Sequence, residues 1–245
     1  FNSEIKITEN MLFAVDYKNT LRSFNISDGS ELWNFQTENS FAISDTINSL
    51  IVIDNLVIFS NSIGDITAVD IENGLITWQL PTQSTNIINE SYKFRNSKLV
   101  SDKKSIIFSN NKDEFYSIDI KTGVANWINE VNSSVTPILI GNLIFTVSNE
   151  GYLFVIEKNN GNIIRITDLY KNYKEKKRAD IKPIGFVIGN RNLYLTNSDG
   201  QMLVIDLVTG KSIYNIKVAK SFVSEPFISN ENLFVIRKGS IIQYN

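Results

Sequence analysis

A glycine-centred phrase that recurs five times is the feature that most constrains the fold of this chain. The five glycines, called anchor glycines below, lie 38 to 49 residues apart, at Gly29, Gly74, Gly123, Gly161 and Gly210. Four residues before each glycine comes an acid or asparagine, at Asn25, Asp70, Asp119, Glu157 and Asp206. Four residues after each glycine, at what we call the +4 position, come Trp33, Trp78, Trp127, Arg165 and Tyr214. A period of this length indicates repeated units that stack or radiate.

Each unit contains four short runs of β-branched and aromatic residues. In the second unit these predicted strands are Ser49–Ile53, Val57–Ser60, Ile66–Asp70 and Leu75–Trp78. Four short strands joined by tight turns are typical of a propeller blade. A helical array would need apolar spacing of 3.6 over ten or more residues, and no segment has it. The sequence therefore predicts an all-β propeller.

The turns support this interpretation. Ten residues before each anchor glycine stand residues that tolerate the positive φ of a hairpin turn, at Asn19, Gly64, Asp113, Gly151 and Gly200. The acid before each anchor glycine is expected to accept hydrogen bonds from turn N–H groups, as in an Asx-turn. A catalytic or calcium-binding role for these acids is the alternative, but one structural role explains all of the copies.

The +4 aromatic residues allow two interpretations. Each indole is either a stacking platform for a cofactor or sugar, or a side chain that packs against the next blade. Because the position repeats from blade to blade, we favour packing between blades.

The clearest copy of the repeat, residues 64–78 from Gly64 to Trp78, resembles the repeat of the PQQ-like propellers. The C-terminal part, Ser221–Pro226 and Gly239–Asn245, resembles the BamB family of outer-membrane assembly lipoproteins, whose last blade also breaks off after its third strand. The resemblance implies a single propeller domain over residues 1–245. About six blades are present, of which the last is incomplete. Because Glu4–Thr8 is expected to be the first strand of its own blade, the domain is expected to lack N-terminal blades of an eight-bladed ring.

Composition excludes several classes of function. The chain has no cysteine and no histidine, which removes disulfides, thiolate sites and the commonest general base and metal ligand. A net charge of −2 is not that of a general nucleic-acid binder. The Glu, Asn and Asp set that holds calcium and PQQ in quinoprotein dehydrogenases is not found. We therefore expect no catalytic residue, no metal and no cofactor.

Three insertions break the repeat, and such loops often carry binding. In Glu38–Asn48, the apolar Phe41 and Ile43 either pack under the loop or contact a partner, and Asp45 stands where the family has a basic residue. In Pro81–Ser97, Glu90 and Arg95 are candidate partner contacts, and the alternative is that the segment is a long solvated loop. The basic Tyr170–Asp180 either contacts acidic lipids or an acidic partner, or is a solvated loop or short helical turn.

The resemblance implies a non-catalytic scaffold on the periplasmic face of the bacterial outer membrane. The implied partner is the POTRA region of a BamA-like barrel assembly protein, with nascent outer-membrane proteins as further ligands. Membrane association would come only through a lipid anchor upstream of Phe1. Two alternatives stay open: a periplasmic PQQ-dependent quinoprotein enzyme, and a propeller that senses a small ligand or sugar.

Overall fold

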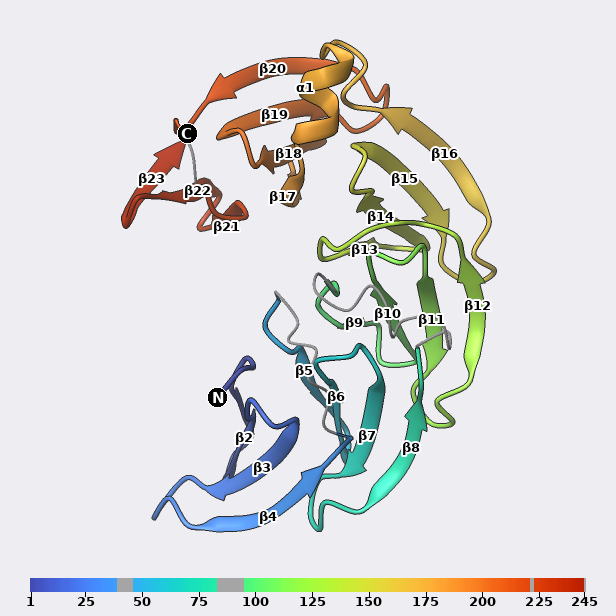
Figure 1. The fold of residues 1–245 in the computed structure, drawn as a ribbon, viewed down its shortest axis with the longest axis vertical. Helices are drawn as coiled ribbons and strands as arrows, with labels where there is room; N and C mark the ends of the chain where they lie inside the picture. Colours follow the sequence, from blue (N-terminus) through green and yellow to red (C-terminus); the bar gives the residue numbers. More distant parts are fainter. Residues whose placement is uncertain (39–45, 83–94, 221–222, 245) are drawn as a thin grey trace. The chain divides into compact units, whose positions relative to one another are not determined.

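The structure is a computed structural model that describes residues 1–38, 46–82, 95–220 and 223–244. These residues form six antiparallel sheets, five with four strands and the last with three, and one short helix. Within each sheet, strands that follow one another in the chain are neighbours (Figure 1). This is the blade structure of a β-propeller. It confirms the predicted all-β fold with about six blades, the last of three strands in the described part.

The first compact unit, Phe1–Glu130, contains three sheets. The first sheet consists of β1 (Lys6–Ile7), β2 (Met11–Val15), β3 (Thr20–Asn25) and β4 (Glu31–Gln36). The second consists of β5 (Leu50–Ile53), β6 (Leu56–Ser60), β7 (Ile66–Asp70) and β8 (Ile76–Leu80). The third consists of β9 (Val100–Ser101), β10 (Ser105–Ser109), β11 (Phe115–Asp119) and β12 (Ala125–Asn129). The predicted strands of the second unit of the repeat agree with β5 to β8 to within two residues at each end.

The second compact unit, Val131–Asn245, contains the other three sheets. Its first sheet consists of β13 (Ile138–Ile140), β14 (Leu143–Val147), β15 (Tyr152–Glu157) and β16 (Ile163–Asp168). The helix α1 (Glu175–Asp180) precedes β17 (Pro183–Gly189), β18 (Asn192–Asn197), β19 (Gln201–Asp206) and β20 (Ser212–Lys217). The three-stranded sheet consists of β21 (Phe227–Ser229), β22 (Asn232–Arg237) and β23 (Ser240–Tyr244). No helix in the described part of the chain is long and apolar enough to cross a membrane.

The anchor glycines share one left-handed turn conformation. All five have φ between +69° and +76°, and the N–H of each donates to the carbonyl of the residue four positions earlier. Asp119 Oδ1 accepts the N–H groups of Lys121 and Thr122 at 3.0 and 2.9 Å, and Asn25, Asp70 and Asp206 accept similar bonds. The predicted Asx-turn role is thus confirmed at four of the five positions. In the remaining copy, Glu157 accepts the side-chain amide of Asn160 instead.

A β-bulge occurs at the same place in all five four-stranded sheets. The pairing between the third and fourth strands shifts just before the third strand ends, as at Ala68/Val69 and Val204/Ile205. The unpaired residue on the outer strand directly precedes the +4 position. Bulges increase the local twist, so this irregularity turns the outer strand at the point where it meets the next sheet.

Three of the +4 side chains, Trp33, Trp78 and Arg165, bond to the neighbouring sheet of their own unit. The indole Nε1 of Trp33 donates to the carbonyl of Ile71 at 3.1 Å, and that of Trp78 to the carbonyl of Ile120 at 2.8 Å. Both acceptors lie three residues before the anchor glycine of the next sheet. The rings lie against those glycines: a Cβ on Gly74 would come within 2.5 Å of the Trp33 ring. Packing between blades, the interpretation that the sequence favoured, is confirmed for these two residues.

Arg165 takes the place of tryptophan in the second unit. Its guanidinium donates from Nη2 to the carbonyl of Leu207 and from Nη1 to that of Val208, both at 2.6 Å. Leu207 again lies three residues before an anchor glycine, Gly210. The backbone acceptor is therefore the same although the donor chemistry differs.

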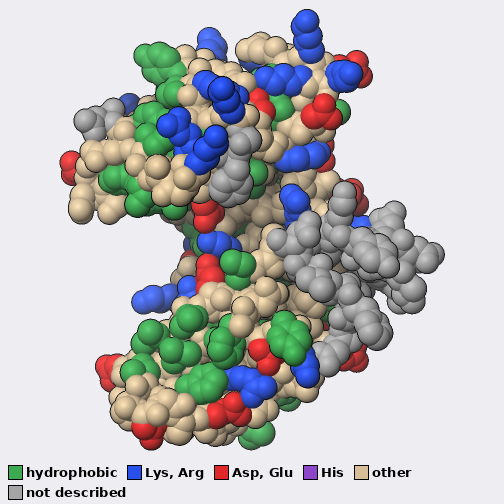
Figure 2. Space-filling model, turned by 60° about the vertical axis from the view of Figure 1, so that its left-hand side comes forward, with side chains coloured by type: hydrophobic (Ala, Val, Ile, Leu, Met, Phe, Trp, Pro, Cys, Tyr) green, Lys and Arg blue, Asp and Glu red, His purple; other side chains and the backbone are tan. Residues whose placement is uncertain are grey.

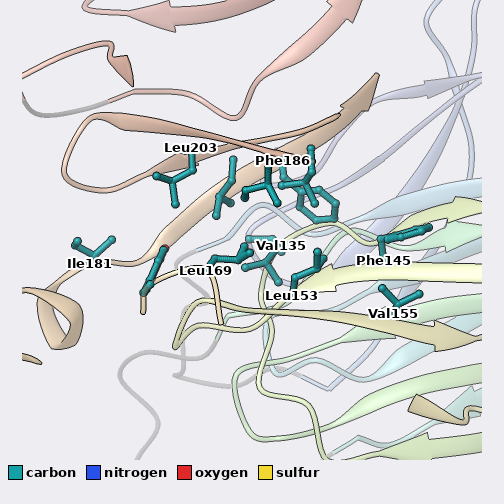
Figure 3. Packing of buried hydrophobic residues seen from close by; sticks show 13 residues of the cluster. Val135, Phe145, Leu153, Val155, Leu169, Ile181, Phe186 and Leu203 are labelled. Atoms are coloured by element: carbon teal, nitrogen blue, oxygen red, sulfur yellow. The ribbon is translucent and has the colours of Figure 1, made fainter. Parts of the chain in front are cut away.

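The core of the second unit includes the ends of the basic insertion. Figure 3 shows Leu169 and Ile181 beside Phe186 and Leu203, in a cluster with β14 and β15 residues. Tyr170 is fully buried in it, and its hydroxyl donates to Asn197 Oδ1 at 2.6 Å. The prediction of a short helical turn is confirmed by α1, which has no buried residue. The alternative of a solvated loop does not describe Tyr170, which is buried.

Candidate partner-binding face

The bases of the first two insertions form the candidate site. We call them the double-loop base, which comprises the described residues Thr37–Glu38, Thr46–Asn48, Pro81–Thr82 and Arg95–Ser97. The first insertion connects β4 to β5, and the second connects β8 to β9. Both insertions therefore leave an outer strand and return to the inner strand of the next sheet, at the same place in the repeat.

Asn19 ties the start of the first insertion to the second sheet. Its φ of +60° belongs to the left-handed region that Asn tolerates. The side-chain amide donates to the carbonyl of Glu38 at 3.2 Å and to Ser62 Oγ at 2.9 Å, and its oxygen accepts the Ser62 N–H at 3.0 Å. The turn between β2 and β3 thus fixes where the first insertion leaves the sheet.

Asp65 connects the starts of the two insertions. The carboxylate is only 8% exposed, and its Oδ1 accepts the Thr82 N–H at 3.0 Å. Burial raises the pKa of Asp65 from its ordinary value of 3.8, and the negative charge of Glu38 raises it further, against hydrogen bonds from Thr82 and Asn61. Glu38 and Thr82 begin the two insertions, so both starts lie near one buried carboxyl group.

The ends of the two insertions also adjoin. Thr46 Oγ1 accepts the N–H of Asn96 at 3.3 Å, and three residues further along both segments Ser49 Oγ accepts the N–H of Leu99 at 2.9 Å. The first and second insertions are therefore held side by side at their starts and at their ends. Loops that follow successive blades at the same place in the repeat thus adjoin at their described ends.

Of the predicted contact residues, only Arg95 is described. Phe41, Ile43, Asp45 and Glu90 lie outside the described residues. Arg95 is exposed, and its backbone forms two hydrogen bonds of 3.0 Å with Asn111, one to the side-chain oxygen and one from the backbone N–H.

Sequence reasoning missed the two residues that organise the double-loop base, Asn19 and Asp65. Asn19 was identified only as a turn residue. The sequence marks Asp65 only as an acid directly after a hairpin glycine, at the start of a predicted strand. Ile47, which is 64% exposed, adds an apolar side chain at the end of the first insertion.

A pocket of about 600 Å³ lies in the second unit. Its lining comes from β17, β18 and the last sheet, and includes Tyr194, Ile228, Glu231 and Tyr244. Its polar lining consists of the carboxylate of Glu231, the phenols of Tyr194 and Tyr244 and the amide of Asn190. Within the described residues, no three His, Cys, Asp or Glu side chains are grouped so that they could hold a metal ion.

The repeated meanders, with their shared turns and sheet-to-sheet bonds, define a protein of the repeat β-propeller class. The family model described as "Outer membrane protein assembly factor BamB" matches residues 1–167. The chain therefore belongs to the BamB family.

Three solved structures share the fold at low sequence identity. BamB from Moraxella catarrhalis has a TM-score of 0.74 at 14% identity, over 98% of this chain and 70% of that one. The computationally designed Ika8 protein has a TM-score of 0.72 at 13% identity, over 99% and 70%. Saccharomyces cerevisiae Sqt1 has a TM-score of 0.71 at 12% identity, over 96% and 67%. A comparison with curated protein sequences found no match.

Proposed function

We propose that the protein is a non-catalytic binding propeller of the outer-membrane β-barrel assembly machinery, at the periplasmic face of the bacterial outer membrane. Its partner would be the POTRA region of a BamA-like protein, and nascent outer-membrane proteins are further candidate ligands. Membership of the BamB family supports this proposal. A chain without histidine or cysteine also offers few groups for catalysis.

The observation that carries the proposed site is the double-loop base. Two long insertions with fixed, adjoining starts and ends can present one continuous surface instead of two independent loops. We propose that Phe41 and Ile43 supply the apolar anchors of that surface, and that Asp45, Glu90 and Arg95 supply charges around them. Central apolar anchors account for most of the affinity of an interface, whereas charges at its rim mainly set the association rate and its salt dependence.

The test is a titration of the intact protein with the periplasmic domains of its cognate BamA-like protein. The variant Phe41→Ala with Ile43→Ala should weaken binding by about 2 kcal/mol, or about thirtyfold. Arg95→Ala should instead lower the association rate and reduce its dependence on salt.

Leu75→Ala with Val124→Ala is the matched control. These side chains are 67% and 64% exposed and follow anchor glycines of the same unit, away from the double-loop base. This variant should bind like the wild type. Equal binding by both double variants would reject the proposed face, and no binding by the wild type would reject the proposed partner.

A further inference from the structure

The electric charge of the chain is divided unequally between its two compact units. Phe1–Glu130 contains 10 Lys and Arg against 17 Asp and Glu, whereas Val131–Asn245 contains 14 against 9. The net charges are −7 and +5, and they combine to the −2 of the whole chain. Figure 2 shows several Lys and Arg side chains in the upper part of the view, which holds α1 and strands of the second unit. A strong asymmetry of this kind indicates a charged partner.

The segment from Lys171 to Lys182 has the densest positive charge. It contains six cationic side chains and two anionic ones, Glu175 and Asp180. Two of the cations are paired within the unit: Lys177 with Asp199 at 3.2 Å, and Arg178 with Asp168 at 2.8 Å. The other four are Lys171, Lys174, Lys176 and Lys182. All four are exposed, and none forms an ion pair with any described residue.

The segment is held in place by its other side chains. Tyr170 is buried in the core at one end, and Ile181 at the other. Between them, Tyr173 packs edge-on against Tyr170, with ring centres 5.6 Å apart, and Arg178 lies 5.0 Å from the ring of Tyr152. The backbone that bears the four lysines is therefore held in place, and their ammonium groups remain free of ion pairs with the described residues.

We propose that this basic surface, defined by Lys171, Lys174, Lys176 and Lys182, binds the anionic headgroup layer of a lipid bilayer. A protein interface needs apolar anchors or a groove. Here the large apolar side chains of the segment are turned into the core, and α1 has no buried residue. An exposed surface whose side chains offer mainly positive charge suits a flat anionic layer, to which each lysine contributes about a fivefold factor in affinity. This proposal does not depend on the BamA-like partner.

The experiment is co-sedimentation of the intact protein with vesicles made of equal parts phosphatidylglycerol and phosphatidylcholine, and with phosphatidylcholine vesicles. The wild type should bind only the anionic vesicles, and added salt should release it. Lys171→Gln with Lys174→Gln and Lys176→Gln should lower the affinity by about a hundredfold. Lys177 and Arg178 are unchanged, so the ion pairs that support the segment remain.

The matched control is Lys103→Gln with Lys104→Gln and Lys121→Gln, which removes three exposed lysines from the acidic unit. It changes the net charge equally and should leave vesicle binding intact. Equal losses of vesicle affinity in the two triple variants would overturn the proposal. Unchanged binding by the variant of the basic surface, or no binding by the wild type, would also overturn it. Binding to polyglutamate but not to anionic vesicles would overturn it in favour of an acidic protein partner.

Discussion

Two carboxyl groups of the first unit should respond to pH in opposite directions. The pKa of Asp65 is raised above 3.8, because burial disfavours its charged form. The pKa of Asp119 is lowered, because the backbone N–H and then the hydroxyl of Thr122 bond to its ionised form. An acid with a raised pKa destabilises the folded protein while it is ionised, and the penalty fades as the pH falls through that pKa. An acid with a lowered pKa stabilises the folded protein above 3.8, and the benefit fades as the pH falls through its lowered pKa.

We therefore expect Asp65→Asn to raise the thermal midpoint at pH 7, because the amide oxygen can still accept the Thr82 N–H without a buried charge. Asp119→Asn should lower the midpoint at pH 7. Both differences should shrink toward zero as the pH is lowered past the folded pKa of each group. Thermal unfolding of the three proteins as a function of pH measures this. Differences of the same sign at pH 7 would contradict the assignment of the two pKa shifts.

The repeat shows which residues occupy equivalent positions, but it does not predict which interaction each side chain makes. It placed Arg165 with Trp33 and Trp78, but the alignment alone did not predict that a guanidinium would donate to the same backbone carbonyl position. Asp65 was missed for a related reason. Thr82, which donates to its carboxylate, and Glu38, whose charge raises its pKa, are distant in the sequence and come near it only in the folded unit. Phe41, Ile43, Asp45 and Glu90 stay predictions.

The contact between neighbouring sheets depends on the missing side chain of the anchor glycine as well as on its φ. Gly29 and Gly74 have φ of +73° and +70°, so alanine is strained equally at both. A Cβ at Gly29 meets nothing within 4 Å, whereas a Cβ at Gly74 comes within 2.5 Å of the Trp33 ring.

We expect Gly29→Ala to lower the free energy of unfolding by about 1 kcal/mol, which is typical of a non-glycine residue in the left-handed conformation. Gly74→Ala should cost a further 1–3 kcal/mol, because the Trp33 ring must move. Urea unfolding of both variants gives the two values. Equal losses of unfolding free energy would mean that the Trp33 ring accommodates a methyl group. Backbone strain alone would then explain why glycine recurs at this position of the repeat.

The strands were predictable because their apolar runs and turn residues carry the signal locally. The predicted runs of the second repeat fall on β5 to β8, and the five anchor turns fall where the glycines are. The bulge before each +4 position was not predicted, because no residue type marks it: the unpaired residue is Leu32 in one sheet and Ile213 in another. The bulge is a shift in the pairing register of two strands, and composition does not show register.

At the scale of the whole chain, a net charge near zero conceals two oppositely charged units. We expect the protein to be retained on a cation exchanger at pH 7 despite its net charge of −2, because a resin binds the basic surface alone. Lys171→Gln with Lys174→Gln and Lys176→Gln should elute at clearly lower salt than the wild type. Lys103→Gln with Lys104→Gln and Lys121→Gln should elute close to it. Passage of the wild type without retention would show that the positive charges are too dispersed to act together.

The bond that joins one sheet to the next makes the repeat modular. The acceptor is a main-chain carbonyl, which every residue possesses, and every copy of the repeat already carries the anchor glycine, so only the donating side chain needs to be specified. Tryptophan and arginine can both donate to this carbonyl, and the receiving sheet needs no compensating substitution. A duplicated blade would bring its own donor and find a ready acceptor in any copy beside it. Units of such a chain can thus diverge in sequence, or change in number by recombination, while each junction stays intact.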